Sequence, residues 1–318
     1  MSPESLTAAV LTGPVVTPRR LASEPWVFAR VAVERIVDVS PTFRRFVLRP
    51  DEPGVLADPG FDQRIKLVPP SPQGIERMPT DPDWYAAWRA LPQHERPPFR
   101  TYTVRGVDDG ALLVDFALHG PDGPAARWAT DAALGDELLV LGPHAAHPGP
   151  HGGVDFVPPA RTAHHLLAGD ETAAPAIARI LEQLPADARG TAVVELPRAG
   201  DADYLPRHPG FTVHALTREG TGHGELLVEH VARIATELVE AHPGVEPEPI
   251  DIDHELLWEV PRSARGGAAL ASAPLYAWLA GEAGAITRIR RHLVKELGVD
   301  RRAVAFMGYW RHGRAENS

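Results

Sequence analysis

The strongest constraint on the fold is a change in the pattern of predicted strands and helices near the middle of the chain. From Trp26 to about Gly142, short runs rich in β-branched and aromatic residues are separated by Pro, Gly and Asp. This spacing is typical of an antiparallel β-barrel or sandwich. Farther on, buried strand-like runs such as HHLLAGD alternate with helical runs such as ETAAPAIARILEQLP, which predicts a doubly wound parallel sheet. We therefore expect a β-barrel domain over residues 25–155 and an α/β domain over residues 156–318.

Three segments depart from this pattern. Residues 1–24 show little hydrophobic periodicity and predict a flexible N-terminal tail. Residues 71–98 are inserted between barrel runs, and their DPDWYAAWRALP core predicts one short helix with Asp81 or Asp83 as its cap. Residues 242–261 are acidic and rich in proline, so we expect them to form an excursion on the surface.

The composition limits the classes of function. The 318 residues include 42 acidic and 32 basic side chains, a formal charge of −10, which argues against binding to nucleic acid or to an anionic membrane. Cysteine is absent, so disulfides, thiolate catalysis and iron–sulfur clusters are excluded. We find no secretory signal and no apolar run of about 20 residues. We expect a soluble, cytoplasmic protein that is a monomer.

The run RTYTVR, which follows a pair of prolines, carries unusual chemistry for an acidic chain. Strand alternation sends successive side chains to opposite faces, so each face carries one arginine. A guanidinium pairs bidentately with phosphate, and a phenol ring offers a stacking surface, which together suit a phosphorylated planar ligand. The alternative is an edge strand with solvated arginines. The two faces are Arg100, Tyr102 and Val104 on one side, and Thr101, Thr103 and Arg105 on the other.

The stretch HGPDGPAARWA, from His119 to Ala129, is a candidate phosphate cradle. Gly120, Gly123 and Pro124 precede the start of an alanine-rich helix. The unpaired N–H groups and the dipole at a helix N-terminus favour a diphosphate. The alternative is an ordinary turn with proline at the first helical position.

The turn LLAGDETAAP occupies the place where a dinucleotide fingerprint lies in a doubly wound domain. Gly169 is its single glycine, so the standard glycine fingerprint is absent, and a generic strand-to-helix turn is the alternative. Arg218 follows the strand-like run FTVHALT. A residue leaving a strand tip on the binding edge faces the adenosine ribose, and an arginine there favours a 2′-phosphate.

The C-terminus and the histidines carry two further features. The C-terminal stretch AFMGYWRHGRAE places Tyr309, Trp310, Arg311 and Arg314 beyond the last predicted strand, where aromatic residues either dock the tail or line the open side of a planar ring. Histidines number 15, but their spacing makes a poor metal site, since strand neighbours point apart. We predict no metal site, and motifs of hydrolases and kinases are absent.

Five stretches, taken in order, resemble the siderophore-interacting protein family, which comprises FAD-containing ferric-siderophore reductases of bacteria with the architecture of ferredoxin–NADP reductases. The resemblance runs from about Trp26 to the C-terminus. It implies a flavin on the barrel and a nicotinamide nucleotide on the second domain. The stretches are RTYTVR, HGPDGPAARWA, LLAGDETAAPAIARILEQLP, WLAGEAGAITRIRRHLVKELG and GYWRHGRAE.

The resemblance assigns roles to individual residues. Thr103 is implied as the residue that hydrogen-bonds near flavin N5, and Arg105 as a phosphate ligand. The FAD set is Arg100, Thr101, Tyr102, Thr103, Arg105, His119, Gly123, Pro124, Ala125 and Trp128. The set implied for NADPH or NADH is Gly169, Asp170, Glu171, Thr172, Gly281 and Glu282, to which Arg218 is added. The basic set implied for the anionic ferric siderophore is Lys66, Arg127 and Arg311.

The implied reaction moves a hydride from the nicotinamide to the flavin and then single electrons to Fe(III). Iron as Fe(II) is held less tightly by hard oxygen donors, so reduction releases it. Ferredoxin is an alternative electron donor. Two other functions stay open: a flavin reductase for a different acceptor, and a siderophore-binding module without reductase activity.

Overall fold

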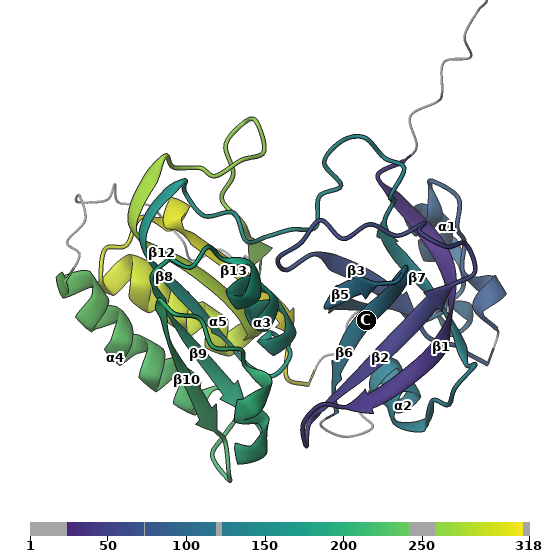
Figure 1. The fold of residues 1–318 in the computed structure, drawn as a ribbon, viewed down its shortest axis with the longest axis horizontal. Coiled ribbons are helices and arrows are strands. Elements are labelled where there is room, and N and C mark those ends of the chain that lie inside the picture. Colours follow the sequence, from purple (N-terminus) through teal and green to yellow (C-terminus); the bar gives the residue numbers. More distant parts are fainter. Residues whose placement is uncertain (1–23, 73, 119–122, 242–257, 314–318) are drawn as a thin grey trace, which may run out of the picture.

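A computed structural model of the chain describes residues 24–72, 74–118, 123–241 and 258–313. These residues form two domains that lie side by side (Figure 1). One domain is an antiparallel sheet curled into a barrel, and the other is a largely parallel sheet with helices on both faces. The predicted fold class is therefore confirmed.

The first sheet has the strand order β4-β3-β7-β1-β2-β6-β5, and neighbouring strands are antiparallel. Its interior is built by alternation: in the middle of β1, Ala29, Val31 and Val33 are buried, and the residues between them are only partly buried. The bounds are β1 (Trp26–Asp38), β2 (Phe43–Pro50), β3 (Arg64–Val68), β4 (Arg100–Thr103), β5 (Gly106–Asp108), β6 (Ala111–Ala117) and β7 (Glu137–Pro143), with helix α2 (Pro124–Asp131) between β6 and β7.

The inserted segment between β3 and β4 contains the predicted short helix, α1 (Trp84–Ala90), and two 3₁₀ turns (Ile75–Arg77 and Gln93–Glu95). Asp83 occupies the N-cap position, but its side chain makes no capping hydrogen bond. Trp88 and Phe99 are buried against Val68 of β3. The insertion therefore has a small apolar cluster of its own on the outside of the barrel.

The second sheet has the order β10-β9-β8-β12-β13-β11. Its strands are parallel except β11, which pairs antiparallel with β13. The bounds are β8 (Arg161–Gly169), β9 (Gly190–Leu196), β10 (Phe211–Thr217), β11 (Trp258–Glu259), β12 (Ser272–Glu282) and β13 (Val304–Trp310). The helices are α3 (Ala174–Gln183), α4 (Glu225–Ala241) and α5 (Ala283–Arg291), with a π-turn (His292–Glu296) and 3₁₀ turns (Ala199–Tyr204 and Arg301–Ala303).

Both faces of this sheet are apolar, as expected for parallel strands between helices. On β12, Trp278 packs on the side of α3, whereas its neighbours Leu275 and Leu279 pack on the side of α4 and α5. The carboxyl ends of β8 and β13 meet at the edge that faces the barrel. This is the edge where ligands bind in doubly wound sheets.

Residues 242–261 were predicted to form a surface excursion, and this prediction is wrong for Trp258 and Glu259. Residues 242–257 lie outside the described part of the chain. Trp258 and Glu259 form β11, because the open edge of β13 accepts a further strand. In the portion of the chain that can be described, no helix combines the length and the apolar character needed to cross a bilayer.

A buried carboxylate joins the two domains. Asp62, which precedes β3, is fully buried. It accepts hydrogen bonds from the backbone N–H groups of Asp155 (3.0 Å) and Phe156 (2.9 Å), and from the indole Nε1 of Trp278 (3.0 Å). Burial and the nearby charge of Asp155 raise the pKa of Asp62 to about 6, although these three donors oppose the shift.

Candidate functional site

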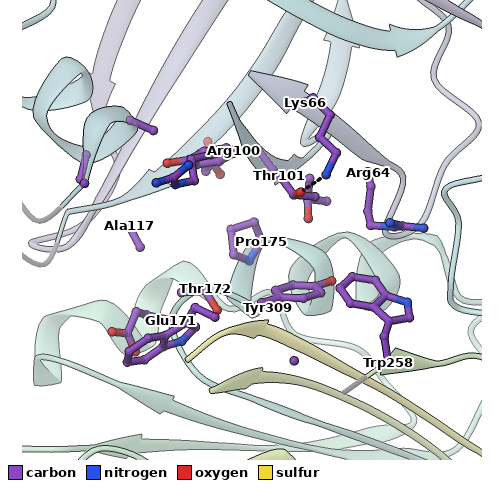
Figure 2. A pocket seen from close by; sticks show the side chains of 18 residues that line it. Arg64, Lys66, Arg100, Thr101, Ala117, Glu171, Thr172, Pro175, Trp258 and Tyr309 are labelled. Carbon is purple, nitrogen blue, oxygen red and sulfur yellow. Dashed lines mark hydrogen bonds between the residues drawn. The ribbon is translucent and has the colours of Figure 1, made fainter. Parts of the chain in front are cut away.

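A cavity of about 450 Å³ lies between the two domains. Figure 2 shows Arg64, Lys66 and Thr101 on the barrel side, with Thr172 and Tyr309 across the cavity. This volume is within the usual range for small-molecule and cofactor sites. The lining residues are Arg64, Lys66, Arg100, Thr101, Tyr102, Thr103, Asp115, Ala117, Gly123, Ala125, Ala126, Glu171, Thr172, Pro175, Trp258, Gly308, Tyr309 and Trp310.

The strand β4 supplies four consecutive residues of this wall, from Arg100 to Thr103. Sheet register places Thr101 opposite Lys66 of β3, and the Lys66 ammonium donates a hydrogen bond to the Thr101 hydroxyl at 2.6 Å. The ring of Tyr102 packs against Phe116 of the barrel interior, with centroids 4.3 Å apart. The first four residues of the predicted flavin strand RTYTVR therefore line the cavity.

The N-terminus of α2 opens onto the same cavity. Gly123 and Ala125 line it, and no side chain caps the helix. Gly123 has φ +102°, and an added Cβ there would meet no atom of the described residues within 4 Å. Amides at a helix N-terminus favour a diphosphate. Together with the strand β4, these residues fit FAD.

The described members of the predicted FAD set do not all line the cavity. His119 is outside the described residues. Pro124 and Trp128 line a second groove, of about 750 Å³, on the other side of α2. Trp128 is held there by ring contacts with Phe46 and Phe116.

Arg105 does not line the cavity. Its guanidinium donates to both carboxylate oxygens of Glu182 on α3, at 2.6 and 2.5 Å, and its Nε lies 3.4 Å from a carboxylate oxygen of Asp115. Asp115 is buried and is also bound by Arg45 and by the Tyr204 hydroxyl. The structure therefore uses Arg105 to connect the barrel to the second domain.

Asp170 organises the opposite wall. It is buried, and its carboxylate accepts from the Thr172 hydroxyl (2.5 Å), from the Glu282 backbone N–H (2.7 Å) and from the Trp310 indole (2.9 Å). Burial first, and then the charge of Glu171, raises the pKa of Asp170. One side chain thus ties together the ends of β8, β12 and β13.

Close packing explains the two glycines beside Asp170. A Cβ on Gly169 would lie 2.4 Å from the backbone oxygen of Ala280. Gly281 has φ +142°, and a Cβ there would lie 2.6 Å from the Asp170 carboxylate. Both positions therefore require glycine. Of the two, Gly169 belongs to the turn LLAGDETAAP, and Gly281 lies at the end of β12.

Arg218 lies in a network of carboxylates at this edge. It bonds to Glu171 at 2.9 and 3.0 Å and to Glu195 at 3.2 Å, and both carboxylates are buried. Burial alone would raise the pKa of Glu171, but hydrogen bonds from His223 and Arg218 outweigh it and lower the pKa to about 2. Glu171 is therefore ionised at neutral pH.

Asp170, Glu171 and His223 each place one potential ligand atom within 4.8 Å of the others, which is the spacing of a metal site. Asp170 already accepts from Thr172 and Trp310, and Glu171 is paired with Arg218 and His223. We therefore interpret this group as a hydrogen-bond network.

Sequence reasoning missed part of the cavity wall. Trp258 stacks on Tyr309, with ring centroids 5.6 Å apart, and the Arg64 guanidinium lies 4.7 Å from the Trp258 ring centroid. Strand alternation from Lys66 could have identified Arg64, since the two are two residues apart on β3. No local signal identified Trp258, because it lies at the end of an acidic segment.

The structure does not gather the predicted basic set around one cavity. Lys66 lines the cavity between the domains, whereas Arg127 lines the groove on the other side of α2. Arg311 is exposed and lines neither. Of the three, Lys66 alone is placed next to the proposed flavin strand.

Family comparisons cover most of the chain. Residues 32–147 match the siderophore-interacting FAD-binding domain, and residues 162–313 match the siderophore-interacting protein model. The first match coincides with the barrel and the second with the parallel sheet and its helices. FAD is thus the cofactor of the barrel domain.

Individual proteins show the same likeness. The chain is 31% identical over 197 residues to the NADPH-dependent ferric-chelate reductase of Escherichia coli, covering 60% of this chain and 72% of that one. It is 26% identical over 254 residues to the ferric vibriobactin reductase ViuB of Vibrio cholerae, covering 79% and 77%. The crystal structure of the siderophore-interacting protein SipS from Aeromonas hydrophila superimposes with a TM-score of 0.63 at 29% identity, covering 91% and 94%.

Proposed function

This chain belongs to the siderophore-interacting protein family, and we propose that it is an FAD-dependent reductase of ferric siderophores that uses NADPH or NADH. Relatives named as reductases of ferric vibriobactin and of ferric chelates support the acceptor. The name of the Escherichia coli relative supports a nicotinamide donor. We place iron release in the cytoplasm.

One observation carries the proposal: the cavity joins three features that the reaction requires. The strand β4 and the N-terminus of α2 provide a surface for a flavin diphosphate. The turn after β8 and the end of β13 bring the nucleotide edge of the second domain to the same space. Arg64 and Lys66 provide positive charge beside it, which suits an anionic ferric chelate.

The side chains of this protein position the cofactor and the substrates and take no direct part in the electron transfer. Thr103 is buried and lines the cavity, so its polar groups can hydrogen-bond to a flavin edge. Tyr309, backed by Trp258, closes the face opposite β4. Bound FAD supplies the redox chemistry: one NADH or NADPH reduces two Fe(III) to Fe(II), leaving oxidised nicotinamide and one proton.

On the nicotinamide side, Glu171 and Thr172 line the cavity, and Trp310 is fixed by its bond to Asp170. Gly281 and Glu282 support this wall, because the Glu282 N–H also binds Asp170. Glu282 in addition caps α5 through the Ala285 N–H at 2.8 Å. We therefore propose that Glu171 and Thr172 contact the nicotinamide nucleotide, and that Gly169, Asp170, Gly281 and Glu282 position them.

The test uses purified protein under nitrogen. NADH or NADPH is added together with a ferric siderophore and a colorimetric ligand that traps Fe(II). We expect a yellow protein that releases FAD on heating and forms two Fe(II) per nicotinamide consumed. A protein that oxidises the nicotinamide with a quinone but yields no Fe(II) supports a different acceptor. A colourless protein that binds the ferric chelate supports a binding module.

A further inference from the structure

A separate cavity, of about 700 Å³, adjoins the flavin cavity on the outside of the barrel. Arg64 and Lys66 line both cavities. They are two residues apart on β3, so their side chains leave the same face of the strand. A ligand in the second cavity would therefore share a wall with the flavin.

Aromatic rings form much of this second cavity. Trp26 and Phe28 come from β1, and Trp84 comes from α1 of the inserted segment. Phe28 and Trp84 meet edge to face, with ring centroids 5.6 Å apart. All three are only partly buried, whereas Trp88 and Phe99 behind them are buried. The outer rings thus keep accessible surface towards the cavity.

The basic side chains of this cavity lie deeper than the acidic side chains of its lining. Arg64 and Lys66 are half-buried, and Lys66 Nζ lies 5.3 Å from the centroid of the Phe99 ring. The acidic residues of the lining, Glu24 and Asp81, are exposed. Asp155 also faces Arg64, at 2.8 Å. Because Asp155 is buried and pairs with Arg64, the positive charge that an anion meets at the inner wall lies mainly on Lys66, whereas the exposed carboxylates of Glu24 and Asp81 are screened by solvent.

We propose that this second cavity binds the ferric siderophore and selects chelates with catecholate arms. The inference rests on the proposed function, which it makes more specific. A catecholate presents a flat ring, which stacks on tryptophan, together with anionic oxygens, which pair with a guanidinium or ammonium group. A hydroxamate chelate has neither the ring nor the charge. The shared wall of Arg64 and Lys66 would hold the iron beside the flavin.

The inserted segment then has a function. Trp84 is its contribution to the cavity, and Trp88 and Phe99 hold the helix that carries it. The same cluster also stabilises the fold. A test must therefore separate loss of ligand contact from loss of packing.

The test measures binding to the oxidised holoprotein by calorimetry, with redox-inert gallium complexes of enterobactin, a catecholate, and of desferrioxamine B, a hydroxamate. Trp84→Leu removes the ring, and Trp84→Phe retains one. Tyr85→Leu is the matched control, because Tyr85 neighbours Trp84 on α1 but is 49% exposed and does not line the cavity.

We expect the wild type to bind the catecholate at least about tenfold more tightly than the hydroxamate. Trp84→Leu should weaken catecholate binding by about 2- to 12-fold, the worth of an aromatic pair, and leave hydroxamate binding unchanged. Trp84→Phe should restore most of the affinity, and Tyr85→Leu should have no effect. Equal affinity for the two complexes, or equal losses in Trp84→Leu and Tyr85→Leu, would overturn the proposal.

Reduction is measured separately on the same proteins with the ferric complexes. Selective catecholate binding without formation of Fe(II) would refute the reductase and leave the binding site standing. Reduction of both ferric complexes with equal KM, unaffected in Trp84→Leu, would refute the selectivity and leave the reductase standing.

Discussion

The Arg218 guanidinium donates to both oxygens of the Glu171 carboxylate, at 2.9 and 3.0 Å. One of its nitrogens also reaches Glu195 at 3.2 Å. The Glu195 carboxylate in turn accepts from the Gly224 and Leu227 N–H groups at the start of α4. Two buried carboxylates thus face one guanidinium at the edge where a nucleotide would bind. This pairing argues against the 2′-phosphate role that the strand-end position of Arg218 suggested.

We predict that the enzyme uses NADH at least as well as NADPH, because a 2′-phosphate would meet excess negative charge beside Arg218. Arg218→Ala should change kcat/KM for the two nucleotides by similar factors. The measurement is anaerobic flavin reduction with each nucleotide in both proteins. A preference for NADPH of about tenfold or more, lost selectively in Arg218→Ala, would restore the 2′-phosphate role.

Arg100 and Arg105 should differ, although both belong to RTYTVR. Arg100 lines the flavin cavity, so Arg100→Ala should lower flavin affinity by one to two decades, about 1.5–3 kcal/mol for a charge-assisted contact. Arg105→Ala should instead destabilise the fold by about 1–3 kcal/mol, since it removes two hydrogen bonds to Glu182 and an ion pair with the buried Asp115. Flavin absorbance and chemical denaturation distinguish the two. Loss of flavin from a stable Arg105→Ala protein would show that Arg105 contacts the cofactor.

Gly281→Ala should disrupt the nicotinamide wall, because the added methyl group would collide with the Asp170 carboxylate. Asp170 would then release Trp310 or Thr172. We expect a loss of about 1–3 kcal/mol of stability and slower flavin reduction by NADH, with normal flavin content. Gly220→Ala is the control, since Gly220 also has a positive φ (+94°) but a Cβ added there would meet no described atom within 4 Å. Similar kinetics in the two variants would assign the effect to backbone strain alone.

The free energy of unfolding should fall as the pH rises through the range in which Asp62 loses its proton. The pKa of Asp62 is raised to about 6 in the folded protein from an ordinary 3.8, so the folded state binds this proton more tightly. The stabilisation is complete below about pH 4 and is lost by about pH 6, a change of roughly 3 kcal/mol. The measurement is the difference in unfolding free energy between wild type and Asp62→Asn, which should shift in favour of wild type at lower pH. A constant difference would show that Asp62 keeps an ordinary pKa.

Local patterns explain why the architecture was predictable. Buried and more exposed side chains alternate along β1, and strands alternate with helices from HHLLAGD onward. Both patterns reflect interactions between residues that are close in the sequence. The same holds for α1, which was predicted from DPDWYAAWRALP. The composition of RTYTVR departs from that of the chain and predicted a ligand-binding strand, and its first four residues line the cavity between the domains.

Long-range pairings could not be predicted in this way. Arg105 meets Glu182, and Arg218 meets Glu171, only after the domains have folded, and these ion pairs change what each arginine can bind. Trp258 reaches the cavity because the edge of β13 accepts β11. Lys66 and Arg127 carry the same charge, yet β3 places Lys66 at the cavity between the domains and α2 places Arg127 in the other groove.

The most direct test of the reductase reaction follows one flavin through both halves of the cycle. The protein is reduced with one equivalent of NADH under nitrogen and is then mixed in a stopped-flow instrument with a ferric catecholate siderophore and a trap for Fe(II). We predict that the flavin absorbance returns and that two Fe(II) form per flavin, with a rate that falls as salt screens Arg64 and Lys66. If the flavin stays reduced in the presence of the ferric chelate but is reoxidised by a quinone or by oxygen, the protein is not a ferric-siderophore reductase.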